Sequence, residues 1–147
     1  MNVVVDANLV VALVLPLPYS DQAVARFAAW KQAGVDLLAP VLFEYEVIAV
    51  LRKAVVAGLL TTGLAGEAMR SILALHVQCV LPTLELHSRA LYWAECLGHT
   101  KTCDAHYLAL AEQRQAELWT ADRRLANSAR QEGVAWLRWV GEAAVGV

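Results

Sequence analysis

Five short apolar runs alternate with longer helical segments, and this alternation constrains the fold more than any other feature. The apolar runs are residues 3–5, 35–39, 76–81, 117–120 and 134–137. Short apolar runs bounded by turn residues predict strands that are buried on both faces of a sheet. Strands that alternate with helices are typical of a parallel sheet covered by helices on both sides. We therefore predict an α/β fold with three layers, α/β/α, around a central parallel sheet of about five short strands.

The segments between these runs have the periodicity, caps and breakers of helices. We predict helices over residues 7–15, 20–32, 41–57, 62–75, 83–97, 102–115 and 122–131. Pro16 ends the first of them, because proline cannot continue a helix. Gly34 and Gly98 each follow a helix at the position where glycine is favoured. Residues from Gly141 onward are predicted to form a loose tail.

The length and composition are those of one globular domain. The chain has 147 residues with no linker or repeat, so we predict a single domain over residues 1–147. Hydrophobic residues make up 59% and charged residues 18%, which excludes a disordered protein. No run approaches the roughly 18 apolar residues of a membrane span, and no secretory signal is present. Three cysteines without paired spacing argue against a disulfide framework or a zinc site and fit a cytoplasmic protein.

Four acidic side chains are the candidates for a functional site. They are Asp6, Glu46, Asp104 and Asp122. Asp6 and Asp122 follow predicted strands, and ligands of parallel sheets bind beyond the carboxyl ends of the strands. Each of the three aspartates also has an ordinary explanation as a helix cap. Glu46 lies among apolar neighbours, so it needs a cation, and Lys53 on the same helix face is an alternative to a metal ion.

Carboxylates that converge at one end of a sheet repel one another unless a cation or a proton joins them. Oxygen ligands suit Mg²⁺ or Mn²⁺, which polarise a phosphodiester, activate water and neutralise developing charge. A net charge of −2 also means that binding nucleic acid requires such a cation or a local basic patch. We predict that Asp6, Glu46 and Asp104 hold one ion and that Asp122 is a weaker ligand or holds a second ion. Glu44 points about 200° away from Glu46 on a helix, so we assign it to the rim.

Other polar residues accompany the acids. Asn8 and Thr120 are predicted to orient ligands or water, although a turn or capping role explains either equally well. Three basic residues flank the last two acids: Lys101, Arg123 and Arg124. They are predicted to position RNA phosphates, with solvated surface charge as the alternative. His106 lies off the helical face of the third acid and is interpreted as structural.

Four stretches of sequence carry the acids: VVVDAN from Val3, APVLFEYEV from Ala39, CDAHYLALA from Cys103 and LWTADRRL from Leu118. In this order they resemble the PIN-domain family, and most closely the VapC-type toxin ribonucleases of type II toxin–antitoxin systems. The resemblance extends to about Trp139. Six residues separate Pro40 from Glu46, as in the family, which supports Glu46 over its neighbour Glu44. Asn8 and Cys103 depart from the family, which often has Ser or Thr at the first position and Tyr at the second.

The resemblance implies a PIN-like fold, endoribonuclease activity, dependence on Mg²⁺ or Mn²⁺, homodimers and a small antitoxin partner. We therefore predict a metal-dependent endoribonuclease that cleaves RNA phosphodiester bonds by metal-activated water, as the toxin component of a type II pair in the cytoplasm. A structure-specific DNA nuclease on the same fold is a weaker alternative, because such enzymes usually have a larger chain with helical insertions that this sequence lacks.

Two other classes of function stay open at this point. A non-catalytic or solitary PIN-fold interaction module would use its aspartates as caps and recruit a partner through an apolar helix. Residues 41–60 are more apolar than one core needs, which predicts burial in a dimer or a groove for a partner helix. A phosphotransfer enzyme of the haloacid dehalogenase type also starts with a strand that ends in Asp, but it has a second Asp where this chain has Asn8.

Overall fold

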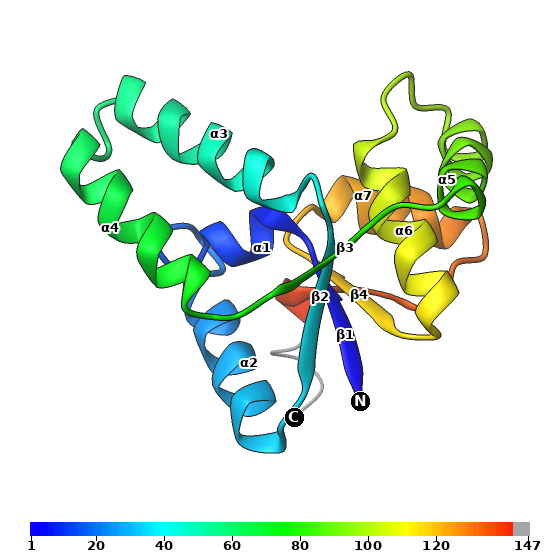
Figure 1. The fold of residues 1–147 in the computed structure, drawn as a ribbon, viewed down its shortest axis with the longest axis horizontal. Coiled ribbons are helices and arrows are strands. Elements are labelled where there is room, and N and C mark those ends of the chain that lie inside the picture. Colours follow the sequence, from blue (N-terminus) through cyan, green and yellow to red (C-terminus); the bar gives the residue numbers. More distant parts are fainter. Residues whose placement is uncertain (143–147) are drawn as a thin grey trace.

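The structure is a computed structural model that describes residues 1–142, and at its centre lies a parallel sheet of five strands (Figure 1). The strands are β1 (Asn2–Val5), β2 (Asp36–Pro40), β3 (Gln78–Val80), β4 (Glu117–Thr120) and β5 (Leu137–Trp139). Their order across the sheet is β3-β2-β1-β4-β5, and every neighbouring pair is parallel. The predicted α/β fold with about five short parallel strands is confirmed.

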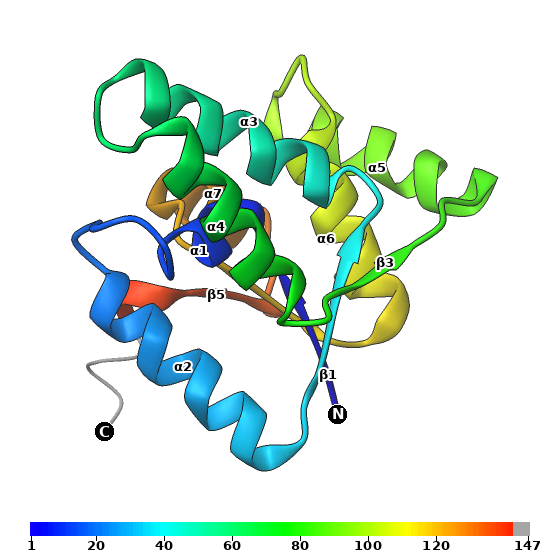
Figure 2. The same cartoon turned by 60° about the vertical axis from the view of Figure 1, so that its left-hand side comes forward.

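Helices cover both faces of this sheet. They are α1 (Ala7–Val11), α2 (Ser20–Ala33), α3 (Phe43–Val56), α4 (Thr62–Leu73), α5 (Leu84–Leu97), α6 (Cys103–Arg114) and α7 (Arg123–Gln131), with a short 3₁₀ helix η1 (Val140–Glu142). The helices α1 to α4 lie on one side of the strands and α5 to α7 on the other (Figure 1). On the second side α6 packs against β1, β2 and β4, and α5 packs against α6 (Figure 2). The three predicted layers are therefore present.

The strand order reverses between β1 and β4, and this reversal places the candidate site. The chain moves outward from β1 through β2 to β3 on one side, and it then crosses to β4 and β5 on the other. Right-handed crossovers in opposite directions put their helices on opposite faces, which leaves a gap at the ends of the two central strands. The backbone N–H of Asp6 donates to the carbonyl of Trp119 at 3.0 Å, so the β1–β4 ladder reaches the first acid.

The last strand differs from the prediction. The sequence predicted a strand over residues 134–137, whereas β5 begins only at Leu137. Gly133 has a φ of 81°, and the N–H of Val134 returns to the carbonyl of Ala129 at 3.0 Å. Val134 therefore belongs to the cap that ends α7, and the strand starts three residues later. The predicted tail from Gly141 begins inside η1, and residues 143–147 lie outside the described residues.

The first helix is also shorter than predicted, ending at Val11 rather than at residue 15. The N–H groups of Leu13 and Val14 donate to the carbonyls three residues earlier, at 3.0 Å each. This tighter winding is common at helix ends, and here it leads the chain into Pro16.

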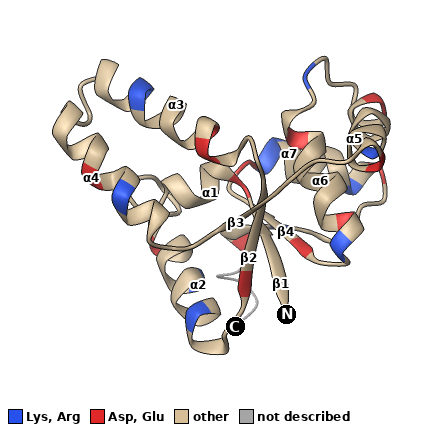
Figure 3. Ribbon diagram, viewed as in Figure 1, with Lys and Arg blue, Asp and Glu red and all other residues tan. Residues whose placement is uncertain are grey.

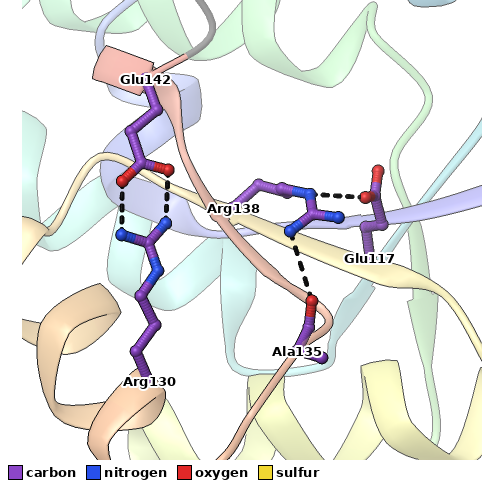
Figure 4. A network of polar contacts seen from close by, with 5 residues as sticks. All are labelled: Glu117, Arg130, Ala135, Arg138 and Glu142. Carbon is purple, nitrogen blue, oxygen red and sulfur yellow. Dashed lines mark hydrogen bonds and ion pairs between the residues drawn. The ribbon is translucent and has the colours of Figure 1, made fainter. Parts of the chain in front are cut away.

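Ion pairs attach the C-terminal elements to the rest of the fold (Figure 4). Arg138 of β5 donates through Nε to Glu117 of β4 at 2.8 Å. Arg130 of α7 meets Glu142 of η1 through both carboxylate oxygens. Both pairs are partly exposed, and such pairs contribute only about 0–1 kcal/mol each, so they orient β5 and η1 more than they stabilise them.

The apolar surplus on α3 divides into a buried face and an exposed face. Phe43, Val47, Leu51 and Ala54 are buried in the chain's own core. The exposed apolar side chains are different ones: Tyr45 (78% exposed), Ile48 (47%) and Val56 (73%), with Leu59 and Leu64 following in and near α4. No helix within residues 1–142 is long and apolar enough to span a membrane.

We expect Leu51→Ala to lower the free energy of unfolding by about 2–5 kcal/mol, because it empties a fully buried position in the core. Ile48→Ala on the exposed face of the same helix is the matched control and should cost less than about 1 kcal/mol. Urea unfolding followed by circular dichroism measures both. An equal loss in the two variants would contradict the assignment of Ile48 to a free surface.

Candidate active site

Asp6 stands at the carboxyl end of the central strand and is almost completely buried, with 4% of its surface exposed. It occupies the N-cap position of α1, yet its side chain accepts no capping hydrogen bond. Its Oδ2 instead accepts a hydrogen bond from the hydroxyl of Thr120 at 2.9 Å. The ordinary explanation of Asp6 as a helix cap therefore does not account for its carboxylate.

Thr120 and Asn8 connect the ends of β1 and β4. The Thr120 hydroxyl accepts from the backbone N–H of Asp122 at 3.0 Å while it donates to Asp6. The side-chain oxygen of Asn8 accepts from the N–H of Ala121 at 3.1 Å and lies 3.3 Å from the Thr120 hydroxyl. The sequence placed both residues beside the acids, and the structure brings them into one network that joins residues more than a hundred positions apart.

Asp122 caps α7, so its ordinary explanation is correct. Its Oδ1 accepts from the N–H groups of Arg124 and Leu125 at 3.0 and 3.1 Å. Both capping bonds use the same oxygen, and Oδ2 takes part in neither. Capping therefore orients the carboxylate through Oδ1 and leaves Oδ2 outside the capping hydrogen bonds.

Glu46, in the first turn of α3, has a partner that the sequence interpretation missed. The hydroxyl of Tyr107 on α6 donates to its Oε1 at 2.8 Å, and Tyr107 is fully buried. The alternative partner, Lys53, makes no ion pair with Glu46 in the described structure. Tyr107 follows Asp104 by three residues, which places both on neighbouring positions of one helix face. This three-residue spacing is the sequence signal that could have indicated that Tyr107 lies near the acids.

Asp104 lies in the first turn of α6, where Thr102 rather than Asp104 holds the N-cap position. Burial raises the pKa of Asp104, and the charge of Asp122 raises it further, whereas His99 lowers it. His99 precedes α6 in the loop after α5 and was not among the predicted site residues. Figure 3 shows acidic positions near the start of α3 and near the start of α6, on the two sides of the sheet.

The four acids influence one another electrostatically. Burial raises the pKa of Asp6 to about 7, and the charges of Asp104 and then Glu46 add to this effect. Burial also raises the pKa of Glu46, with a further contribution from Asp104. Asp104 thus interacts with each of the other three acids, so the fold gathers all four predicted acids into one region.

Among residues 1–142 no lysine or arginine forms an ion pair with these acids, although the charge of His99 lowers the pKa of Asp104. The ion pairs of residues 1–142 are Arg89–Glu112, Arg130–Glu142 and Arg138–Glu117, and none includes one of the four acids. Buried carboxylates without a cation are costly, and oxygen donors without nitrogen or sulfur fit a hard divalent cation. As the side chains stand, however, no three Asp, Glu, His or Cys residues in the described part of the chain are arranged to hold a metal ion. Binding an ion would require the carboxylates to draw together.

The three predicted basic residues are placed differently from one another. All three are exposed: Lys101 lies in the loop before α6, and Arg123 and Arg124 lie in the first turn of α7. The guanidinium of Arg123 lies 5.0 Å above the ring of Trp139, which directs it toward β5. Only Lys101 and Arg124 are therefore free of a described side-chain partner.

A family model for the PIN domain matches residues 3–131 of this chain. The chain belongs to the PIN-domain family. PIN domains are generally nucleases and typically use divalent metals. The matched region contains all four acids together with Asn8 and Thr120, and it ends before β5.

Solved structures show the same fold at low sequence identity. The crystal structure of PAE2754 from Pyrobaculum aerophilum is 20% identical, with a TM-score of 0.68 over 99% of this chain and 93% of that chain. The structure of VapBC-1 from nontypeable Haemophilus influenzae is 17% identical, with a TM-score of 0.59 over 95% of this chain and 96% of that chain. No match was found among curated protein sequences.

The raised pKa of Asp6 predicts a pH dependence of stability. The folded protein binds the Asp6 proton more tightly than the unfolded chain, whose Asp pKa is near 3.8. Stability from this group is therefore fully present below about pH 4 and is lost as the pH rises to about 7. The loss amounts to at most about 4 kcal/mol.

Asp6→Asn replaces the carboxyl group with an amide that does not titrate. Between pH 4 and pH 8 the free energy of unfolding of the native chain should therefore fall relative to that of Asp6→Asn, as measured by urea titration in EDTA. If the two curves run parallel across this interval, the buried carboxylate does not titrate as described.

Proposed function

We propose that this chain is a divalent-metal-dependent endoribonuclease, a single PIN domain over residues 1–147 that uses Mg²⁺ or Mn²⁺. The observation that supports it most is the acidic region near the ends of β1 and β4, which takes part in no ion pair within residues 1–142 and where burial and mutual repulsion raise the pKa values of Asp6, Glu46 and Asp104. A cation relieves this repulsion, and a site with so much negative charge needs one to admit a phosphodiester.

In this proposal Asp6, Glu46 and Asp104 hold the ion, directly or through water. Asp122 is a weaker ligand, or holds a second ion, because its Oδ1 accepts two backbone N–H groups, whereas Asp6 and Glu46 each accept one hydroxyl. When bound, the cation supplies Lewis-acid activation of the phosphodiester and of water, and it neutralises the charge that develops as the bond breaks. To hold the ion, the acids would have to draw closer together than they stand in the described structure.

Neighbouring side chains keep the acids in position. Thr120 directs Oδ2 of Asp6, and Asn8 fixes the backbone that carries Thr120 and Asp122. Burial and the charges of Asp6 and Glu46 raise the pKa of Tyr107, so its hydroxyl remains a proton donor to Glu46. Lys101 and Arg124 are proposed to contact RNA phosphates at the rim, and Arg123 joins them if its side chain leaves Trp139.

An antitoxin partner and a homodimer are part of the same proposal, as is an action in the cytoplasm. The similar structure from Haemophilus influenzae is named VapBC-1. The exposed apolar side chains of α3, among them Tyr45 and Val56, offer a surface for a protein partner. The alternative of a non-catalytic interaction module uses this same surface, so only a test of the acidic site separates the two.

Ribonuclease activity on single-stranded and structured RNA tests the proposal. We expect cleavage with Mg²⁺ or Mn²⁺, none with EDTA, and a loss of at least about 100-fold in Asp6→Asn, Glu46→Gln and Asp104→Asn, since each removes charge stabilisation at the reacting phosphate. Glu44→Gln is the matched control, because Glu44 is exposed and lies two residues from Glu46. Its activity should stay within about twofold of native.

Cleavage that survives EDTA, or that survives both aspartate substitutions, would overturn the proposed site. If no RNA is cut, calorimetric titration with Mn²⁺ decides the outcome. Binding that Asp6→Asn abolishes supports a nuclease whose substrate was not supplied, whereas absence of binding supports the interaction module.

Tyr107→Phe should weaken Mn²⁺ binding about tenfold, since loss of a hydrogen bond that orients a ligand typically costs 10- to 100-fold in affinity. The substitution removes only the hydroxyl and keeps the buried ring, so the fold should persist. Calorimetry measures the affinity directly. Tyr45→Phe, which removes an exposed hydroxyl on α3, is the control and should bind as the native chain does. Unchanged binding in Tyr107→Phe would mean that Glu46 needs no such support.

A further inference from the structure

Two histidines outside the acidic region meet between α5 and α6. Nδ1 of His87 lies 2.8 Å from Nε2 of His106, and the two rings stand at 81° with their centroids 5.0 Å apart. His87 is exposed and His106 is half-buried. On α6 His106 is two residues from Asp104, so the two side chains leave the helix about 200° apart. The histidine pair is therefore distinct from the acidic region.

The contacts of His106 determine where the protons of the pair lie. Its Nδ1 is 2.8 Å from the carbonyl oxygen of Thr102, which can only accept, so Nδ1 carries the hydrogen. In the neutral ring, Nε2 then presents a lone pair toward His87. The hydrogen between the rings belongs to His87 Nδ1. Moving that hydrogen to the other nitrogen of the exposed His87 ring leaves two lone pairs facing the same point.

Two facing imidazole nitrogens are ligands for borderline transition metals such as Zn²⁺, Ni²⁺ and Cu²⁺ rather than for Mg²⁺. Zn–N bonds of roughly 2.0–2.1 Å at a tetrahedral angle separate two nitrogens by about 3.3 Å. The observed separation is 2.8 Å, so a small rotation of the exposed His87 ring makes room for an ion. The bond from His106 Nδ1 to a backbone carbonyl is also the arrangement that commonly orients a metal-binding histidine.

We propose that His87 and His106 bind one borderline transition-metal ion, with Zn²⁺ as the reference, and that water completes its coordination. The ion replaces the hydrogen bond between the rings and joins α5 to α6. The site is separate from the proposed nuclease site in both place and ligand chemistry, because one offers nitrogen and the other offers oxygen.

Zn²⁺ titration of the full chain without a histidine tag, followed by calorimetry under reducing conditions, tests this proposal. With Mg²⁺ in excess to occupy the acidic region, we expect one equivalent of Zn²⁺ bound in the native chain and in Asp104→Asn, with a dissociation constant that rises at least about tenfold in His87→Asn and in His106→Asn. His76→Asn is the matched control and should not change it, because His76 is exposed in the loop between α4 and β3. Asparagine also tolerates the positive φ of 55° at that position.

A thermal melt provides a second measurement. Zn²⁺ should raise the melting temperature of the native chain and of His76→Asn but not of His87→Asn, which confirms that each variant folds. Zn²⁺ binding that persists in both His87→Asn and His106→Asn, or absence of binding in the native chain, overturns the proposal. Loss of binding in Asp104→Asn with both histidines intact would also overturn it, because the ion would then occupy the acidic region. Failure of the nuclease proposal leaves these outcomes unchanged.

Discussion

The carboxylate of Asp6 is buried where the central strand ends, beside other carboxylates and without an ion-pair partner among residues 1–142, and the arrangement of the site follows from this placement. β1 lies between β2 and β4 in the middle of the sheet, so its end is covered by helices from both faces. A buried charge in such a position is expensive unless a proton or a cation accompanies it. Burial accordingly raises the pKa of Asp6. A fold selected for stability alone would have an amide or an apolar side chain here.

The hydrogen bonds around the acids hold them near one another despite their repulsion. One oxygen of Asp6 takes the Thr120 hydroxyl, one oxygen of Glu46 takes the Tyr107 hydroxyl, and one oxygen of Asp122 takes two backbone N–H groups. In each case these bonds leave the second oxygen of the carboxylate outside the contact. The donors come from β4 and from α6 and α7, which lie on the same side of the sheet, so the central sheet and one helix layer orient the acids. This arrangement is compatible with a site that awaits a cation.

Much of the fold and the location of the acids could be predicted from the sequence. Short apolar runs between amphipathic segments identify parallel strands, and an acid that directly follows such a run must lie at the carboxyl edge of the sheet. The prediction was wrong for the last strand, because Gly133 and Val134 complete a helix cap before β5 begins. The sequence showed that residues 41–60 are unusually apolar but not which side of α3 is exposed, because it does not specify which side of that helix meets α1 and α4. The exposed apolar face of the described helix is made of Tyr45, Ile48 and Val56.

The sequence by itself determined the order of strands and helices, the acids at the strand ends and the lack of a cysteine or histidine cluster near them. These features depend on local periodicity and on neighbours within a few residues. Only the tertiary structure decided that Tyr107 rather than Lys53 meets Glu46, that Thr120 joins Asp6 to Asp122, and that His87 meets His106. Each of these contacts joins elements that the sheet and its crossovers bring together. The sequence alone could not predict them, because distances between residues on different helices and strands depend on tertiary packing, which no local pattern encodes.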